Sequence, residues 1–342
     1  MLHLLDLTPE QLKGWLAEHD LPGYRAAQIR QWLFERSADG FEAMTDLARP
    51  LRSRLAEEFR IWTTEVVARQ EADDGTEKLL LALSDGERIE CVLLRDDKKR
   101  RTICISTQAG CAMGCAFCAS GLEGVKRNLT AGELVEEMLQ LKRLLPHDER
   151  LSHVVVMGMG EPLLNLDALL HALATATDPE ALAISARRIT ISTVGLPGPM
   201  RRLAEHNAPY HLAVSLHAPD DELRNRLVPS NRKVGIAAIL AAADHYFERT
   251  GRRITYEYVL LAEVNDQLRH ARRLVELLRG RPALVNVIPY NRVSGLPYRT
   301  PPAADSARFV EILREGGLNA QLRYRKGDRI AAACGQLRGA TA

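Results

Sequence analysis

The spacing of hydrophobic residues changes period twice along the chain. Residues 1–60 favour helices, because Leu12, Trp15 and Leu16 recur at helical spacing. They follow Thr8-Pro-Glu-Gln11, which has the form of a capping box with proline at the first helical position. A small helical bundle is the expected fold, and phosphate contact by its helix ends is the weaker alternative. Two more helices are predicted, one carrying Ile29, Trp32 and Leu33 and one starting near Pro50.

Residues 61–96 change to alternating apolar and polar positions. The pairs Asp74-Gly75 and Asp85-Gly86 are hairpin turn signals, so we expect a β-meander here. In its last strand Glu90 shares a face with the apolar Val92. An acid in that position is unusual, although a solvated carboxylate at a sheet edge is the simpler interpretation.

From residue 101 onward, short apolar strands alternate with amphipathic helices. This order predicts parallel βαβ units with right-handed crossovers. Six such units indicate an α/β fold, an open or partial (β/α)6 TIM-like barrel. The predicted strands are 102–107, 152–157, 187–193, 210–216, 254–260 and 283–288. The expected domains are an N-terminal helical accessory domain (1–62), a β-meander linker (63–96), the barrel core (97–328) and a C-terminal tail (329–342).

Polar and small residues collect where the predicted strands end. Active sites of such barrels lie at the carboxyl ends of the strands, so these residues are expected to meet. Each one alone is better explained as a capping or solvated loop residue; their convergence is the stronger argument. They are Gly158-Met-Gly-Glu-Pro162, Ser192, Ser215-Leu-His217 and Asn291, together with a cysteine-rich loop after the first strand.

That loop places Cys111, Cys115 and Cys118 within eight residues, with spacings of three and two. Thiolates are the ligands of iron–sulfur clusters and of soft metals. A structural zinc site has four ligands, usually in two separated pairs, and the sequence has no second pair. Cys104 lies within a predicted strand and is poorly placed to act as the fourth ligand. We therefore favour a four-iron four-sulfur cluster with one iron left open, and keep zinc as the alternative.

The remaining cysteines and the net charge say less about function than the cysteine loop does. No secretory signal and no apolar run of about 18 residues is evident, so we expect a cytoplasmic protein without a membrane span, whose cysteines stay reduced. Cys91 fits a core position, while Cys104 and Cys334 are either buried packing or functional thiols. The net charge of +2 does not argue for nucleic acid, and only Lys98–Arg101 and Arg323–Arg329 are basic runs.

Taken together, the motifs resemble those of a known family. The spacing of the three cysteines is similar to that of radical S-adenosylmethionine (SAM) enzymes, and the wider set resembles the RlmN/Cfr family of RNA adenine methyltransferases over nearly the whole chain. The matching segments are Gln108–Cys118, Arg127–Thr130, Met157–Asn165, Ala213–Pro219, Arg226–Pro229 and Ala332–Leu337.

The resemblance implies a role for each candidate residue. The three cysteines would hold the four-iron four-sulfur cluster, whose open iron chelates SAM. Cys334 would take a methyl group from one SAM, and a second SAM, cleaved reductively, would give a radical that abstracts hydrogen from that methyl. The carbon radical would add to adenine, Glu90 would remove the ring proton, and Cys104 would release the product by forming a disulfide with Cys334. The implied SAM-binding residues are Gly160, Glu161, Ser192, Ser215, Leu216, His217 and Asn291.

The resemblance also implies the substrate and partners. It favours carbon 2 of adenine in 23S ribosomal RNA and in transfer RNA, with a flavodoxin-type electron donor. Carbon 8 or another RNA target is the alternative, because Ala119-Ser120-Gly121, Arg329 and Ala331 depart from the usual pattern. A radical SAM activase and an iron–sulfur electron carrier are the readings outside RNA methylation.

Overall fold

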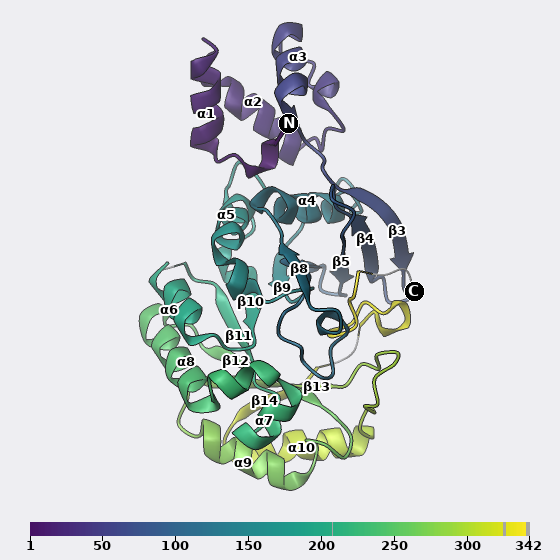
Figure 1. Ribbon diagram of the computed structural model, residues 1–342, viewed down its shortest axis with the longest axis vertical. Helices are drawn as coiled ribbons and strands as arrows, with labels where there is room; N and C mark the ends of the chain where they lie inside the picture. Colours follow the sequence, from purple (N-terminus) through teal and green to yellow (C-terminus); the bar gives the residue numbers. More distant parts are fainter. Residues whose placement is uncertain (207, 324–325, 340–342) are drawn as a thin grey trace.

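One ten-stranded sheet forms the body of the protein (Figure 1). The computed structural model describes residues 1–206, 208–323 and 326–339. In spatial order the strands are β14 (Asn319–Leu322), β13 (Ala283–Pro289), β12 (Ile254–Leu260), β11 (His211–Ser215), β10 (Ile189–Thr193), β9 (His153–Val156), β6 (Arg101–Cys104), β5 (Arg88–Arg95), β4 (Glu77–Ala82) and β3 (Glu65–Glu71).

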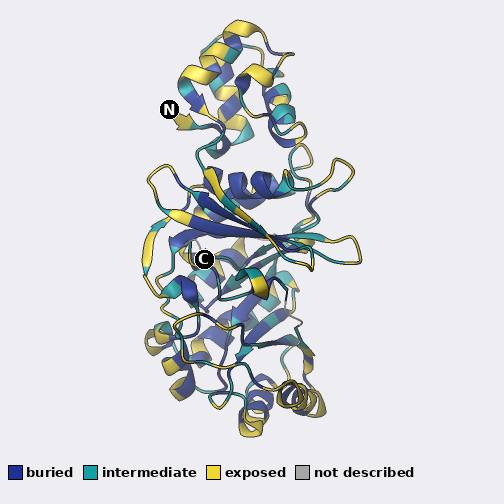
Figure 2. Ribbon diagram, turned by 90° about the vertical axis from the view of Figure 1, so that its right-hand side faces the viewer, coloured by how far each residue is buried: buried dark blue, intermediate teal, exposed yellow. Residues whose placement is uncertain are grey.

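The seven strands from β6 to β14 are parallel and form the predicted partial barrel. All six strands predicted from the pattern are present, and β14 is an additional strand that the prediction missed. Helices cover the outer face of the sheet, whose strands are largely buried (Figure 2). These helices are α4 (Ala131–Lys142), α5 (Leu166–Thr177), α6 (Pro197–Glu205), α7 (Asp221–Leu227), α8 (Ile236–Thr250), α9 (Leu268–Leu278) and α10 (Ala303–Glu315).

The meander continues the barrel sheet. Strands β3, β4 and β5 are antiparallel, and β5 is hydrogen-bonded to β6 with Val92 opposite Cys104. The segment expected as a linker is therefore built into the core sheet. Because side chains alternate along a strand, Glu90 lies on the same face as Val92 and Cys104, whereas Cys91 points to the opposite face and is fully buried.

The N-terminal helices form a bundle at one end of the molecule (Figure 1). They are α1 (Pro9–Glu18), α2 (Arg25–Phe34) and α3 (Arg49–Glu58). The predicted capping box is confirmed, since the Thr8 hydroxyl accepts from the Gln11 N–H and the Gln11 side chain accepts from the Thr8 N–H. A parallel pair of short strands, β1 (Leu2–His3) and β2 (Phe59–Arg60), closes the bundle where it meets the core.

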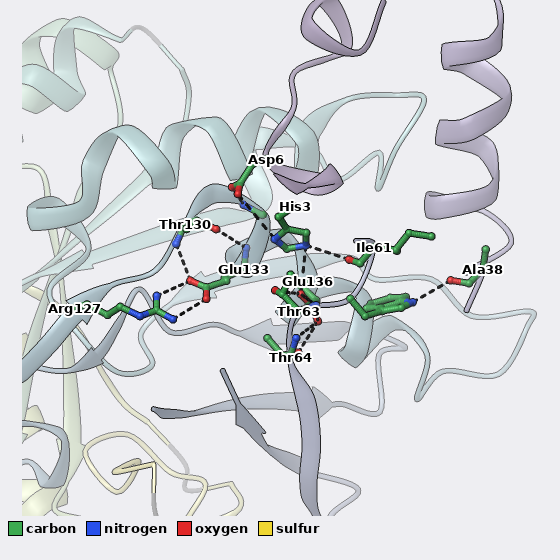
Figure 3. Close-up of polar contacts among 12 residues, drawn as sticks. His3, Asp6, Ala38, Ile61, Thr63, Thr64, Arg127, Thr130, Glu133 and Glu136 are labelled. Carbon is green, nitrogen blue, oxygen red and sulfur yellow. Dashed lines mark hydrogen bonds and ion pairs between the residues drawn. The ribbon is translucent and has the colours of Figure 1, made fainter. Parts of the chain in front are cut away.

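A buried glutamate of α4 joins the bundle to the core (Figure 3). The Glu136 carboxylate accepts hydrogen bonds from the backbone N–H and hydroxyl groups of both Thr63 and Thr64, at 2.6 to 3.2 Å. His3 Nε2 lies 3.4 Å from the same carboxylate and also contacts the Ile61 carbonyl. The Glu136 carboxylate thus accepts from four donors of Thr63 and Thr64, which connect the bundle to the core, and it also contacts His3 of the first strand.

The C-terminal segment returns to the meander. Residues 326–339 lie beside β4 and β5 (Figure 1), and Lys78 and Glu90 of these strands both contact it. Within the described residues, no helix combines the length and apolar character needed to cross a membrane. Arg325 of the predicted basic run and residues 340–342 of the predicted tail lie outside the described residues.

Candidate active site

A two-stranded ribbon presents the cysteine loop. Strands β7 (Gln108–Gly110) and β8 (Val125–Asn128) pair antiparallel, and the Cys111 N–H donates to the Gly124 carbonyl at 2.9 Å. Gly110 has φ +76°, and a Cβ there would lie 2.0 Å from that carbonyl oxygen. Only glycine therefore fits at the base of the loop.

The three cysteines line one cavity, together with the ends of several barrel strands. Burial, and then the neighbouring cysteines, raise the pKa of the Cys115 thiol well above its usual value. The pKa of Cys111 is raised to about 11 by burial, with Cys118 adding to the shift. The thiols therefore face one another across a poorly solvated space, where a positive centre is needed to stabilise their thiolates.

Among the described residues, no group of three or more His, Cys, Asp or Glu side chains converges closely enough to hold a single metal ion. A four-iron cluster is bound by one thiolate per iron, so its cysteines surround the cluster and do not meet at one point. The donor set and the cavity therefore fit a cluster held by Cys111, Cys115 and Cys118.

The turn after β9 contributes a buried carboxylate. Glu161 is 2% exposed and lines the cavity; it accepts hydrogen bonds from the N–H groups of Leu163 at 3.1 Å and Val194 at 2.9 Å. Burial raises its pKa to about 7, and these hydrogen bonds oppose the shift. An ammonium group beside this buried carboxylate would stabilise its charged form.

Gly160 beside Glu161 has a packing role that the sequence did not indicate. Its φ is +102°, and a Cβ there would lie 2.7 Å from the Gln108 side chain. Because residue 160 is glycine, the turn after β9 can pack closely against β7. This close approach also brings Gly160 to the wall of the cavity.

His217, after β11, faces the cavity as a neutral donor. Its Nδ1 accepts from the Val259 N–H at 3.1 Å, so the ring proton is on Nε2. Burial, and then the charge of Arg224, lower its pKa to about 3. Its ring packs edge-on against Phe117 of the cysteine loop, with centroids 4.9 Å apart. A neutral imidazole N–H suits a polar ligand atom.

Ser192 and Ser215 line the same cavity, but Leu216 does not. The Leu216 side chain is fully buried in the hydrophobic core, so any contact of this residue with a cofactor would have to use its backbone. The structure adds Arg224, a fully buried arginine of α7 that the sequence analysis missed. It donates to the carbonyls of Val194, Ser215 and Leu216 and so fixes the ends of β10 and β11.

Cys334 lies between this cavity and a second one. It lines both, whereas Cys104 lines only the second. Burial, and then the neighbouring Cys334, raise the pKa of Cys104 to about 12. The two predicted thiols are therefore close together, and both are free thiols in this structure.

Arg323 also lines both cavities. Its pKa is raised chiefly by Cys334, with further contributions from Glu257 and Cys104. This residue of the predicted basic run therefore points inward to the thiols, and its side chain does not add to an RNA-binding surface.

Glu90 lies beside the tail and not in the cysteine cavity. It is 2% exposed, forms an ion pair of 2.8 Å with Lys78, and accepts from the N–H groups of Arg338 at 2.7 Å and Gly339 at 3.1 Å. The expected solvated edge carboxylate is therefore wrong. The third cavity that Glu90 lines also contains Arg292 and Gln336.

The fold is that of the radical SAM superfamily, whose family model matches residues 105–275. The model of the "Ribosomal RNA large subunit methyltransferase N-terminal domain" matches residues 2–61. The chain belongs to the RlmN family of dual-specificity RNA methyltransferases, as the resemblance predicted.

Similar proteins cover the chain almost completely. A probable dual-specificity RNA methyltransferase RlmN of Rhodopirellula baltica is 58% identical over 98% of this chain and 90% of its own length. The corresponding protein of Moorella thermoacetica is 46% identical over 98% of this chain and 97% of its own length. The crystal structure of a radical SAM methyltransferase from Sphaerobacter thermophilus, 43% identical, superposes with a TM-score of 0.96 over 99% of this chain and 100% of that one.

Proposed function

We propose that this protein methylates carbon 2 of adenine in 23S ribosomal RNA and in transfer RNA, through a methylated Cys334 and a covalent enzyme–RNA adduct. The position of Cys334 carries the proposal. Cys334 lines the cavity of the three cysteines on one side and the cavity of Cys104 on the other. A thiol at this junction can receive a methyl group from the first cavity and meet the resolving thiol in the second.

The residues of the first cavity fit the cofactors of the superfamily. Cys111, Cys115 and Cys118 would hold the cluster, and Glu161 would hold the ammonium group of SAM. The Nε2–H of His217 and the free Oδ1 of Asn291 supply one donor and one acceptor for the remaining polar atoms. Two molecules of SAM would be consumed per turnover. Together with the cluster they would supply the methyl group and the radical chemistry that an unactivated ring carbon requires.

The other residues would act on the RNA and on the adduct. The charge of Arg323 opposes the rise that burial causes in the pKa of Cys104, and the thiolate is the nucleophile. Cys104 would attack the Cys334 sulfur, so that a disulfide forms as the carbon–sulfur bond breaks. The electron pair of that bond stays on the methylene carbon, which takes up a proton to become the methyl group of the base. Glu90 would take the ring proton, because its carboxylate is the buried base on the face of β5 that carries Val92.

Carbon 2 and the two RNA classes rest on family likeness. The relatives at 58% and 46% identity are described as dual-specificity RNA methyltransferases, which supports two RNA substrates. Neither cavity distinguishes carbon 2 from carbon 8 by its lining residues. The proposal includes a flavodoxin-type electron donor and a cytoplasmic location, where these RNAs are found.

Mass spectrometry of RNA digests tests the proposal. RNA from cells with and without this protein is digested to nucleosides and to fragments. We expect 2-methyladenosine at one ribosomal and at least one transfer RNA position only when the protein is present. An 8-methyladenosine product, or no difference between the two RNA pools, would contradict the proposed reaction.

A further inference from the structure

The Lys78–Glu90 ion pair contacts both ends of the segment that carries Cys334. Lys78 Nζ donates to the Ala331 carbonyl at 3.2 Å and lies 2.8 Å from Glu90 Oε1. Glu90 Oε2 accepts from the N–H groups of Arg338 and Gly339. One buried cation and one buried anion, on adjacent strands β4 and β5, thus bind the start and the end of residues 331–339.

The middle of this segment is fastened to the cofactor side. The Ala119 N–H, beside Cys118, donates to the Gly335 carbonyl at 2.8 Å, and the Ser120 hydroxyl donates to the Leu337 carbonyl. Asn291 Nδ2 donates to the Cys334 carbonyl at 3.1 Å. With both ends and the middle fixed, Cys334 stays at the edge of the cysteine cavity.

The geometry points to Lys78 as a positioning residue. We propose that the Lys78–Glu90 pair is a latch that holds residues 331–339 with Cys334 at the cysteine cavity, and that RNA opens it. The second part rests on the proposed function. A carboxylate oxygen that accepts from Arg338 and Gly339 has to lose these donors before it can take a proton from a nucleobase. RNA arriving at Glu90 would therefore release the end of the segment and free Cys334 to move towards the base.

This device would impose an order on the reaction. Cys334 is held near the cofactor residues until RNA is present, so methyl transfer to the thiol comes first. A purely structural ion pair would predict no such coupling, since buried pairs often add little net stability. The two explanations differ in how the tail behaves when Lys78 is replaced.

Hydrogen exchange of the cluster-loaded full-length protein, without RNA, measures the latch. In Lys78→Met we expect the amides of residues 331–339 to exchange about tenfold faster or more than in the wild type. We also expect slower methylation of Cys334 by SAM, measured on its proteolytic peptide. Lys78→Arg, which keeps the charge, should restore most of both properties. Lys13→Met, at an exposed position of α1, is the matched control and should change neither.

A second variant guards against simple loss of stability. Lys78→Met leaves the buried Glu90 without its counter-ion, so Lys78→Met/Glu90→Gln, which has no charge here, is measured beside it. The latch predicts fast exchange of the tail in the double variant while the amides of β4 and β5 remain protected. Wild-type exchange of the tail in either Lys78→Met variant would overturn the proposal. Failure of the wild type to methylate RNA would contradict the proposed function instead, because tail exchange is measured without RNA.

Discussion

Asn291 links the cofactor cavity to Cys334. Its Nδ2 donates to the Cys334 carbonyl at 3.1 Å, while its Oδ1 is buried with no hydrogen-bond partner among the described residues. A buried acceptor without a donor is costly unless a ligand supplies one. Asn291 lines the cysteine cavity, so bound SAM is the natural source of that donor.

Asn291→Ala should therefore weaken SAM binding and loosen the Cys334 segment together. Loss of one buried hydrogen bond predicts an affinity about tenfold lower. Anaerobic titration calorimetry with the cluster-loaded protein measures the change. Asn319→Ala, an exposed amide on β14, is the control and should bind SAM as the wild type does. Equal affinity in the two variants would show that Asn291 does not contact the cofactor.

Each cysteine of the loop should be needed for iron. Cys111→Ala, Cys115→Ala and Cys118→Ala each remove one of the three thiolates proposed to hold the cluster, so reconstituted protein should retain little iron and sulfide. Iron analysis and visible absorption provide the measurement. Cys91→Ala, which removes a buried thiol on the other face of β5, should retain the wild-type iron content. Full iron in any of the three loop variants would refute the assigned ligand set.

Glu137 should make stability depend on pH. Burial raises its pKa well above the usual value, and only its Oε2 has a partner among the described residues, the Ser106 N–H at 2.9 Å. The native protein therefore keeps a proton that the unfolded chain releases near pH 4.5. Above that pH the unfolded state binds fewer protons, so this group lowers stability as pH rises towards the native pKa.

Glu137→Gln should remove this loss. Urea unfolding at several pH values is expected to show a variant at least about 1 kcal/mol more stable than the wild type at pH 8, and little difference at pH 5. Glu10→Gln, an exposed acid of α1, serves as the control. A difference of the same size at both pH values would contradict the assigned proton.

The Glu136 joint should hold the N-terminal bundle on the core. Glu136→Ala would leave the half-buried donors of Thr63 and Thr64 without their acceptor, which predicts a loss of about 3 kcal/mol in the free energy of unfolding. Urea unfolding and proteolysis near residues 61–64 provide the measurement. Glu276→Ala, exposed on α9, should cost far less, and equal losses would show that the joint adds nothing specific.

Local patterns were enough to predict much of the fold. The Thr8 capping box, the Asp-Gly turns and the six core strands depend on residues close in sequence, and all are present. Strand β14 was missed because Asn319-Ala-Gln-Leu322 is short and only half apolar, and its order comes from pairing with β13. A strand that is stabilised by contacts with distant segments cannot be recognised from the periodicity of its own residues.

The same distinction applies to the site. The cysteine loop and the polar strand ends are visible in the sequence, whereas Lys78 is not. Lys78 meets Glu90 only because β4 pairs with β5 in a register that places Lys78 opposite Val92 and Leu80 opposite Glu90. A lysine directly before the apolar run Leu79–Ala82 was the available signal. Arg323 belongs to a basic run, and a charge run does not show which way each side chain points.

Replacing Cys334 with alanine removes the thiol that would carry the methyl group. Wild-type and variant proteins, both loaded with cluster, are incubated with SAM, a reductant and ribosomal RNA, and the digested RNA is analysed by mass spectrometry. We predict 2-methyladenosine from the wild type and none from Cys334→Ala, although the variant should keep its iron and still bind SAM, because Cys334 is not among the proposed ligands of the cluster. Methylated adenine formed by Cys334→Ala would contradict the role of Cys334 as the carrier of the methyl group.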